Sequence, residues 1–229
     1  MKVYAAAVVK APLTAIAAEY ESEGGDKAVL IFDTAGATEQ KFRADPEAEL
    51  LITTALLIGK AEGSGALRDG TSIALGSTVA GLAVTPGSPK PDAATPEGFK
   101  AALLSARRIA VSDPARGATV GKHFMQVIEQ LGAKDEIMRK IAFAPDGLET
   151  MRRVMAGEAD LGVSQSSEIE QAGHDAFVGP FPKEFALTTS FSLWHPNTIA
   201  PAAAAFIARL TGPAGRKKLA AGGIITGIE

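Results

Sequence analysis

The sequence predicts an α/β protein of two lobes, and three observations support this. Short apolar runs alternate with segments that carry apolar residues at helical spacing, a pattern typical of a parallel sheet covered by helices. The alternation occurs twice along the chain. Two long strand-like segments, 72–87 and 185–196, separate an outer part from an inner part. We therefore expect lobe I to contain residues 1–77 and 191–229 and lobe II residues 78–190, with the long segments forming a two-stranded hinge.

Lobe I begins with the order strand, helix, strand, helix, strand. Each predicted strand is a short apolar run of ordinary strand length. The first helix has Pro12 near its start, where proline is well tolerated. The predicted strands are 3–9, 28–34 and 48–54, and the predicted helices are 13–22 and 36–44.

The first long segment, 72–87, is apolar and is interrupted by Gly76 and Gly81. A strand of this length exceeds the usual range unless it bends or passes between domains. The segment that follows, 86–98, is rich in proline and polar residues, so we expect a loop.

Lobe II repeats the alternation of short apolar runs with helical segments. Its first helix has Thr95 placed as the N-cap and Pro96 in the first turn. The elements predicted from there on are a helix at 96–106, a strand at 107–113, helices at 119–132 and 146–158, and a strand at 160–167 whose polar end lies in a loop. After the second long segment the chain returns to lobe I, with predicted helices at 198–210 and 212–223.

Composition excludes several classes of protein. There is no cysteine, so disulfides, thiolate catalysis and Cys-ligated metals are excluded. The three histidines are widely spaced, a pattern that does not favour a zinc enzyme, and we expect no metal and no cofactor. The net charge of -3, without basic clusters, does not favour nucleic acid. No segment approaches the roughly 20 apolar residues of a membrane helix. The beginning of the sequence fits either a cytoplasmic protein or a mature secreted one.

The candidate site lies where the predicted strands end. Ligands of parallel α/β sheets bind beyond the carboxyl ends of the strands, and interfaces between domains are preferred sites. Several of these strand ends lead directly into helices, whose N-termini suit anions. We therefore expect a small anion in a cleft between the lobes. The candidate residues from this argument are Lys10, Thr34, Ala35, Gly36, Thr54, Ser112, Arg116, Gly117 and Thr119.

Simpler interpretations exist for each of these residues. A hydroxyl before a helix is most often a cap, and a glycine there is often only a turn residue. Lys10 and Arg116 are also consistent with solvated surface charges, and His123 with a packed or exposed position on its helix. The argument for a site is that all these residues fall at strand ends of the same kind. No residue stands out as catalytic, and no phosphate loop or nucleophile elbow is present.

Four segments in series resemble the periplasmic molybdate-binding protein family of ABC importers. They are "VYAAAVVKAPLTAIAAEYE", "VLIFDTAGATEQKFRADPEAELLITT", "RRIAVSDPARGATVGKHFMQVIEQLG" and "MRRVMAGEADLGVSQSSEI". The resemblance covers nearly the whole chain and ends with "LTGPAGRKKLAAGGI". It implies a type II periplasmic binding fold, a periplasmic location, a small anionic ligand, an ABC permease as partner and a monomer.

The resemblance also implies positions for the ligand-binding groups, and this sequence departs from the family there. Where the family has a serine in its first loop, this chain has Val8. Where the family has a hydroxyl in its second loop, this chain has Ala35, and Gln165 replaces the tyrosine after the "LGIV"-like strand. The backbone donor before the "DGLETMRR" helix falls on Gly147. Because these hydroxyls are missing, the resemblance favours a divergent branch of the family that also resembles aconitate isomerase. It therefore implies that the ligand is an organic carboxylate, held by Lys10 and Arg116, rather than molybdate.

Two functions therefore stay open. The first is a periplasmic substrate-binding protein of an ABC importer, which needs no catalytic residue. The second is an isomerase of an unsaturated tricarboxylate, which needs a base near the acidic carbon of its substrate. Lys10 and His123 are the bases considered for it. A ligand-sensing domain of a regulator is less favoured, because we see no DNA-binding segment in these residues.

Overall fold

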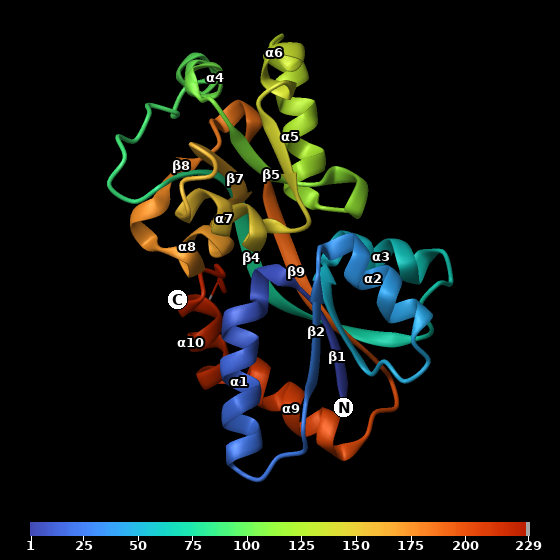
Figure 1. Cartoon of the computed structure of the whole chain (residues 1–229). Helices are drawn as coiled ribbons and strands as arrows, with labels where there is room; N and C mark the ends of the chain where they lie inside the picture. The colour runs from blue at the N-terminus through green and yellow to red at the C-terminus, as the bar shows by residue number, and fades with distance from the viewer. Residues whose placement is uncertain (228–229) are drawn as a thin grey trace. The chain divides into compact units, whose positions relative to one another are not determined.

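The computed structural model describes residues 1–227 and divides the chain into two compact units. Unit 1 contains Met1–Ser77 and the chain from Ser190 onward, and unit 2 contains Thr78–Thr189. The chain passes from unit 1 to unit 2 inside strand β4 (Gly70–Val84) and returns inside strand β9 (Thr188–Pro196). Within each unit, strands pair side by side and helices flank them (Figure 1). Each unit also has its own buried core.

Unit 1 contains a sheet with the strand order β2-β1-β3-β9. Strand β1 pairs in parallel with β2 and β3, as the sequence predicts, and β3 pairs antiparallel with β9. The other elements of this unit, with their bounds, are β1 (Lys2–Ala6), a 3-10 turn η1 (Ala7–Val9), α1 (Lys10–Ser22), β2 (Val29–Asp33), α2 (Ala35–Ala44), β3 (Leu50–Thr54), α3 (Ala55–Gly63), α9 (Pro201–Thr211) and α10 (Pro213–Ala221).

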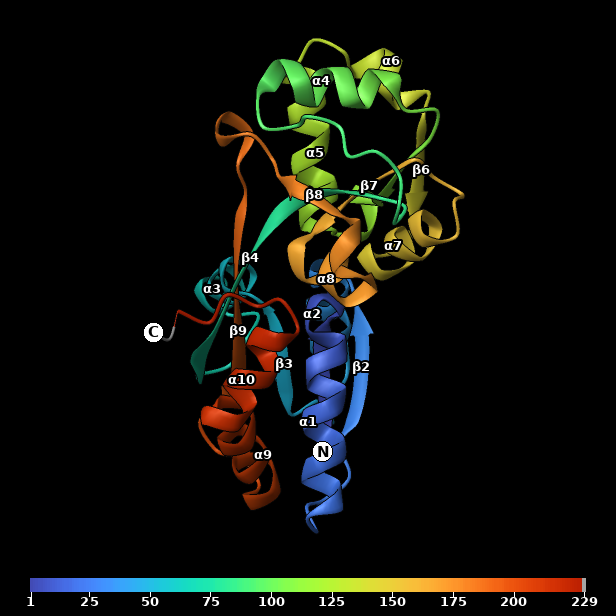
Figure 2. The same cartoon turned by 90° about the vertical axis from the view of Figure 1, so that its left-hand side faces the viewer.

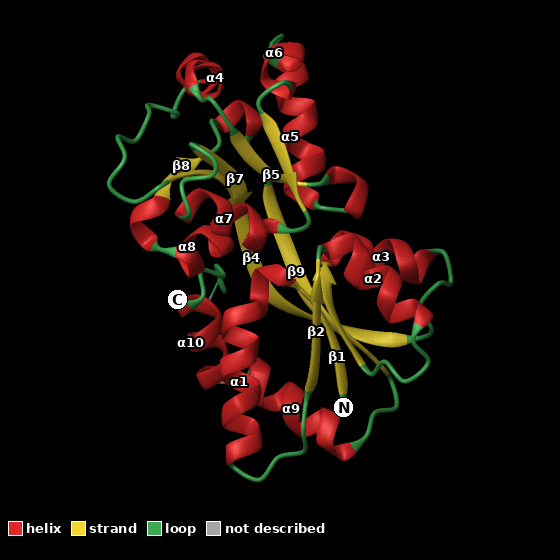
Figure 3. Cartoon of the chain, viewed as in Figure 1, coloured by secondary structure: helices red, strands yellow, loops and turns green. Residues whose placement is uncertain are grey.

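Helices cover both faces of this sheet because its strands are apolar on both sides (Figure 3). Successive side chains of a strand point to opposite faces. On β1, Val3 and Ala5 join the core beneath α1, α9 and α10, whereas Tyr4 joins the core beneath α2 and α3. Trp194 of β9 lies on the same side as Tyr4. The near-continuous apolar runs of the sequence thus correspond to strands buried on both faces.

Unit 2 repeats this plan with the strand order β4-β7-β5-β6, and β8 pairs with β4. Strand β5 pairs in parallel with β6 and β7, and β4 pairs antiparallel with β7. Helices α4 and α5 pack on one face, and α7 and α8 lie side by side on the other (Figure 2). The bounds are α4 (Pro96–Ser105), β5 (Ile109–Ser112), η2 (Pro114–Arg116), α5 (Thr119–Gln130), α6 (Lys134–Met138), β6 (Ile141–Ala144), α7 (Gly147–Met155), β7 (Leu161–Gln165), α8 (Ser166–Ala172), η3 (His174–Ala176), β8 (Phe177–Pro180) and η4 (Lys183–Phe185).

Gly76 and Gly81 of β4 are explained by close neighbours. A Cβ on Gly76 would come within 2.5 Å of the carbonyl oxygen of Ile225, which pairs with Ser77. A Cβ on Gly81 would come within 2.5 Å of the ring of Phe177 in β8. Glycine therefore lets another segment approach the strand on each side of the unit boundary.

Several boundaries differ from the prediction, and the differences at β1 and β7 change the type of element. The strand predicted at 3–9 ends at Ala6, because Ala7–Val9 forms a 3-10 turn and α1 begins at Lys10 rather than at residue 13. An apolar run cannot by itself distinguish a strand from a buried helical turn. The strand predicted at 160–167 ends at Gln165, and the serines expected in a loop open helix α8 instead. Helix α3, helix α6 and strands β6 and β8 were outside the predicted set.

Candidate functional site

Three parallel strands of unit 1 end at the same edge of its sheet, and each leads into a helix. Strand β1 ends at Ala6, opposite Asp33 at the end of β2, and β3 ends at Thr54. Because these strands are parallel, the predicted residues Val8, Lys10, Thr34, Ala35, Gly36 and Thr54 all follow this one edge.

The two threonines at this edge are helix caps. Thr34 Oγ1 accepts a hydrogen bond from the Ala37 N–H at 3.3 Å, and Thr54 Oγ1 accepts one from the Leu57 N–H at 3.2 Å. Both residues are buried. A hydroxyl that accepts in a cap keeps its own proton as a donor, so capping and contact with an anion are compatible. The structure therefore supports the simpler interpretation of these hydroxyls without removing the functional one.

Val8, Ala35 and Lys10 contribute differently. The side chains of Val8 and Ala35 are part of the apolar core of unit 1, so only their backbone groups are suited to a polar ligand. Lys10 is exposed at the first turn of α1, and its ammonium group lies 5.8 Å from the centre of the Phe32 ring. This position leaves the Lys10 charge beside the end of β2.

Sequence reasoning missed Asp33, the last residue of β2. Its buried carboxylate accepts from the Thr34 N–H at 2.7 Å and pairs with Lys41 Nζ at 2.7 Å. The pairing with Lys41 compensates a negative charge at an edge where we expect an anion. The sequence feature that could have identified Asp33 is a carboxylate at the end of a strand, directly before a helix.

Unit 2 presents a second set of strand ends from β5, β6 and β7, which are also parallel. Ser112 ends β5 and is buried. Arg116 Nε donates to the carbonyl oxygen of Pro145 at 3.0 Å, which joins the loop after β5 to the loop after β6. Gly117 has a φ of 79°, a left-handed conformation that favours glycine, and it leads into α5 at Thr119.

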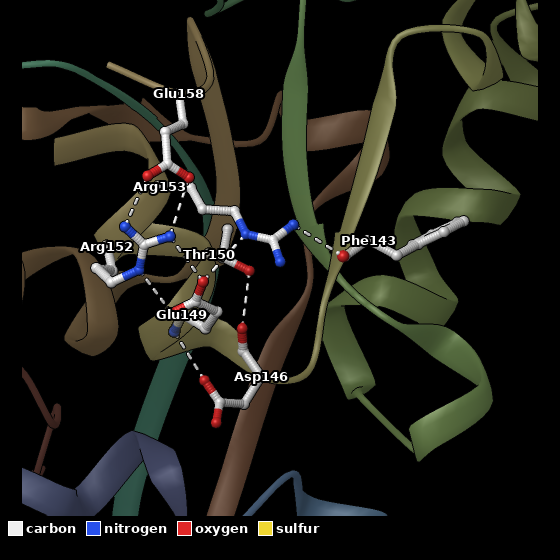
Figure 4. Close-up of polar contacts among 7 residues, drawn as sticks. All are labelled: Phe143, Asp146, Glu149, Thr150, Arg152, Arg153 and Glu158. Carbon is white, nitrogen blue, oxygen red and sulfur yellow. Dashed lines mark hydrogen bonds and ion pairs between the residues drawn. The ribbon is translucent and has the colours of Figure 1, made fainter. Parts of the chain in front are cut away.

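Helix α7 begins at the predicted residue Gly147 and is fixed by a dense set of polar contacts (Figure 4). Asp146 caps the helix by accepting from the Glu149 N–H at 2.8 Å. Glu149 in turn pairs with Arg152 and Arg153, and Arg152 also pairs with Glu158. The bond from Arg152 is the main reason that the pKa of Glu149 lies below its usual value. These pairs stay within α7 and the turn after it, whereas Arg153 Nη1 donates to the carbonyl oxygen of Phe143 at 2.9 Å and so joins α7 to β6.

Gln165, at the end of β7, is committed to a structural link. Its amide oxygen accepts from Thr78 Oγ1 at 2.7 Å, and its amide nitrogen donates to Thr189 Oγ1 at 3.2 Å. All three side chains are buried. The amide thus joins β7 to the first unit 2 residue of β4 and to the last unit 2 residue of β9.

Glu168 is the second residue that sequence reasoning missed. It lies in the first turn of α8 and is buried. Its Oε2 accepts from Ser164 Oγ at 2.6 Å and from the Gln165 N–H at 3.2 Å. A Cβ on Gly147 would overlap the same carboxyl group. Burial raises the pKa of Glu168 to about 7, and the bonds from Ser164 and Gln165 oppose this rise only in part.

His123 is packed inside unit 2 and is not placed at a strand end. His123 stacks on Phe181 with 6.0 Å between ring centres, and its Nε2 lies 2.8 Å from the carbonyl oxygen of Phe185. This ring packs in unit 2 and does not follow a strand end. The described residues contain no cluster of three or more His, Cys, Asp or Glu side chains suited to a metal ion. In the same range, we find no helix with the length and apolar character needed to cross a bilayer.

Two α/β units, each with anion-compatible strand ends, define a solute-binding protein fold, and comparison with known proteins agrees. The periplasmic molybdate-binding protein of Azotobacter vinelandii has a similar structure, with a TM-score of 0.78 at 20% identity over 98% of both chains. This likeness confirms the type II periplasmic binding fold that the sequence predicts. PEB3 of Campylobacter jejuni with bound L-phospholactate is also similar, with a TM-score of 0.69 at 18% identity over 98% of this chain and 99% of that chain.

The family follows from the sequence itself. A model of the bacterial extracellular solute-binding protein family matches residues 1–225, and the chain belongs to this family. Among curated proteins, an aconitate isomerase from a Pseudomonas species is 29% identical over 185 residues, which cover 77% of this chain and 68% of that protein. The resemblances predicted from the sequence, to molybdate-binding proteins and to aconitate isomerase, are thus both confirmed.

Proposed function

We propose that this protein is a periplasmic receptor for a small anion, which it delivers to an ABC permease in the membrane. The observation that carries the proposal is the family match over residues 1–225. The similar proteins support an anion, because their names refer to molybdate, L-phospholactate and aconitate. The strand ends of each unit, with their helix N-termini and the charges of Lys10 and Arg116, supply suitable chemistry.

We propose further that the ligand is an organic carboxylate rather than molybdate. Val8 and Ala35 provide no hydroxyl, and the amide of Gln165 is already bonded to Thr78 and Thr189. Each hydrogen bond to a charged group contributes roughly 1.5–3 kcal/mol, so a tetrahedral oxyanion loses a large part of its affinity when several donors are missing. A carboxylate instead accepts two parallel bonds from an arginine such as Arg116.

A thermal-shift panel tests this proposal. The protein is heated with molybdate, sulfate, phosphate, and di- and tricarboxylates including trans-aconitate. A ligand at 100 times its dissociation constant stabilises the protein by roughly 2.7 kcal/mol, which is a readily measured shift of the midpoint. We expect a carboxylate to give the largest shift. A larger shift with molybdate would reverse the ligand assignment, and no shift with any anion would remove the receptor proposal.

An isomerase of an unsaturated tricarboxylate is the second candidate, favoured by the 29% identity to aconitate isomerase. Such a reaction needs a base that removes a proton from one carbon and an acid that returns a proton to another. His123 is packed against Phe181, which leaves Lys10 as the base considered from sequence. Ultraviolet absorbance of a mixture with cis- or trans-aconitate decides between the functions: a change over many turnovers supports the isomerase, and constant absorbance with binding supports the receptor.

A further inference from the structure

Glu168 is a buried carboxyl group in contact with two residues, Gly147 and Gln165, at positions where the sequence predicts ligand-binding groups. It accepts from the backbone N–H of Gln165 at 3.2 Å, and its carboxyl lies so close to Gly147 that only glycine fits there. Gly147 opens α7, so the carboxyl group lies at the positive end of that helix. Glu168 is the N3 residue of a capping box at the start of α8, but in a capping box on the surface this carboxyl would be solvated, whereas here it is buried.

We propose that Glu168 is a proton-dependent positioning residue for an anion bound at the strand ends of unit 2, beside Ser112, Arg116 and Gly147. The protein then takes up a proton at Glu168 when its anion binds. This inference rests on the proposed function, since it requires an anionic ligand at the strand ends. It applies equally to a receptor and to an isomerase.

The hydrogen bonds show why the neutral form suits a bound anion. In that form Oε2 remains an acceptor for Ser164 and Gln165, while the other oxygen carries the proton. In the ionised form, the carboxylate places a full negative charge beside Gly147. This charge offsets the partial positive charge at the N-terminus of α7, which would otherwise attract the ligand. Like charges in a region of low dielectric constant repel strongly, so ionisation weakens anion binding.

The neighbouring charges leave Glu168 free to respond in this way. Asp146, the cap of α7, is the charged group that acts on Glu168 from that helix, and it raises the pKa further. The other α7 charges, Glu149, Arg152 and Arg153, are paired among themselves and with Glu158. On α8 and the following η3 turn, the charged groups are Glu170, His174 and Asp175, and Glu170 pairs with His174 at the surface. The groups that contact the Glu168 carboxyl from β7, Ser164 and Gln165, are neutral.

Linkage makes the coupling reciprocal. If the neutral form of Glu168 binds the anion better, then the bound anion raises the pKa of Glu168 by the same free energy. Because that pKa is about 7 without ligand, the free protein is partly ionised near neutrality and must take up protons on binding. Between this pKa and the higher pKa of the complex, the affinity of the wild-type protein should fall with pH by at most about tenfold per pH unit, and above the pKa of the complex it should level off.

Isothermal titration calorimetry at pH 7 tests the inference with molybdate, sulfate and trans-aconitate as probes, since these anions do not themselves titrate there. Titrations in two buffers with different ionisation enthalpies give the number of protons taken up. We expect a clear fraction of one proton for the wild-type protein and none for Glu168→Gln, whose amide resembles the neutral acid. Glu136→Gln, on the exposed surface of α6 in the same unit, is the matched control and should behave as wild type.

Two further measurements cover the remaining outcomes. Ser164→Ala removes a donor that favours the ionised form, so the pH at which affinity begins to fall should move upward; this variant serves if Glu168→Gln does not fold. Carbon-13 NMR of the glutamate carboxyl groups should show the Glu168 midpoint rising when a binding probe is added. Anion binding with no proton uptake, or with an unmoved midpoint, overturns this inference but leaves the proposed function. Absence of binding by every probe overturns both.

Discussion

Ser164 donates its hydroxyl to Oε2 of Glu168 across 2.6 Å in the interior of unit 2. The bond favours the ionised carboxylate, whereas burial favours the neutral acid, and burial has the larger effect. The pKa of Glu168 is therefore raised from 4.5 to about 7. A buried acid whose pKa is raised on folding destabilises the folded protein at high pH, and this gives the first prediction.

The stability of the ligand-free protein should fall between pH 4.5 and pH 7 because of Glu168. In this range the folded state retains a proton that the unfolded state has released, so the free energy of unfolding decreases with pH and then levels off above about 7. At about 1.4 kcal/mol per pKa unit, the loss attributable to Glu168 is about 3 kcal/mol. Urea unfolding of the wild-type protein and of Glu168→Gln across pH 4.5–8 measures it. The free energy of unfolding of the variant should increase relative to that of the wild type as pH rises. If the two free energies changed in parallel with pH, the prediction would be contradicted.

Periodicity was sufficient to predict the fold class and most of the helices and strands. The strands of unit 1 are apolar on both faces, so their runs stand out from the helical spacing around them, as with Leu50, Leu51 and Ile52 of β3. The missed elements are short or follow another element without a break. Strand β6 has four residues, and α3 begins directly after Thr54. Such elements are specified by packing against neighbours rather than by local pattern.

The sequence predicts a candidate site at the strand ends, but it does not predict the buried acid beside them. Thr34, Thr54 and Gly117 have the local roles that their positions suggest. Glu168 lies in the polar stretch "SQSSE", which locally favours a loop. Its burial results from the packing of α7 against α8, a contact between residues distant in sequence. The same tertiary context commits Gln165 to two threonines that sequence alone does not connect with it.

Gln165→Leu should destabilise unit 2. The substitution leaves the buried hydroxyls of Thr78 and Thr189 without the amide that bonds both of them. An unsatisfied buried polar group costs about 1–3 kcal/mol, so the free energy of unfolding should decrease by at least that amount. Urea denaturation measures the change. Gln130→Leu, at the exposed end of α5, is the matched control and should change stability by no more than about 0.5 kcal/mol.

Arg116→Ala should weaken the binding of the preferred anion. If the guanidinium contributes a charged hydrogen bond, its loss reduces affinity by about 1.5–3 kcal/mol, which is roughly tenfold or more. Calorimetric titration with the best anion of the panel provides the measurement. Arg139→Ala removes the same charge from an exposed position after α6, so it controls for the change in net charge. Equal affinity for both variants would remove Arg116 from the site.

Gly147→Ala tests whether the contact between Gly147 and Glu168 matters for both stability and binding. The added Cβ would overlap the Glu168 carboxyl group, which is held by Ser164 and Gln165 and therefore has little room to move. Overpacking of a buried site costs about 1–3 kcal/mol. We expect a lower unfolding midpoint in urea together with weaker binding of the preferred anion, because the start of α7 must shift.

Gly59→Ala is the matched control for this substitution. Gly59 lies inside α3, and a Cβ there would meet no atom within 4 Å. Alanine favours a helix interior over glycine by about 1 kcal/mol, so this variant should be as stable as the wild type or more stable. The two alanine substitutions should therefore change stability in opposite directions. If Gly147→Ala instead left both stability and anion affinity unchanged, Glu168 would have space to move away, and the tight packing from which its role is argued would be wrong.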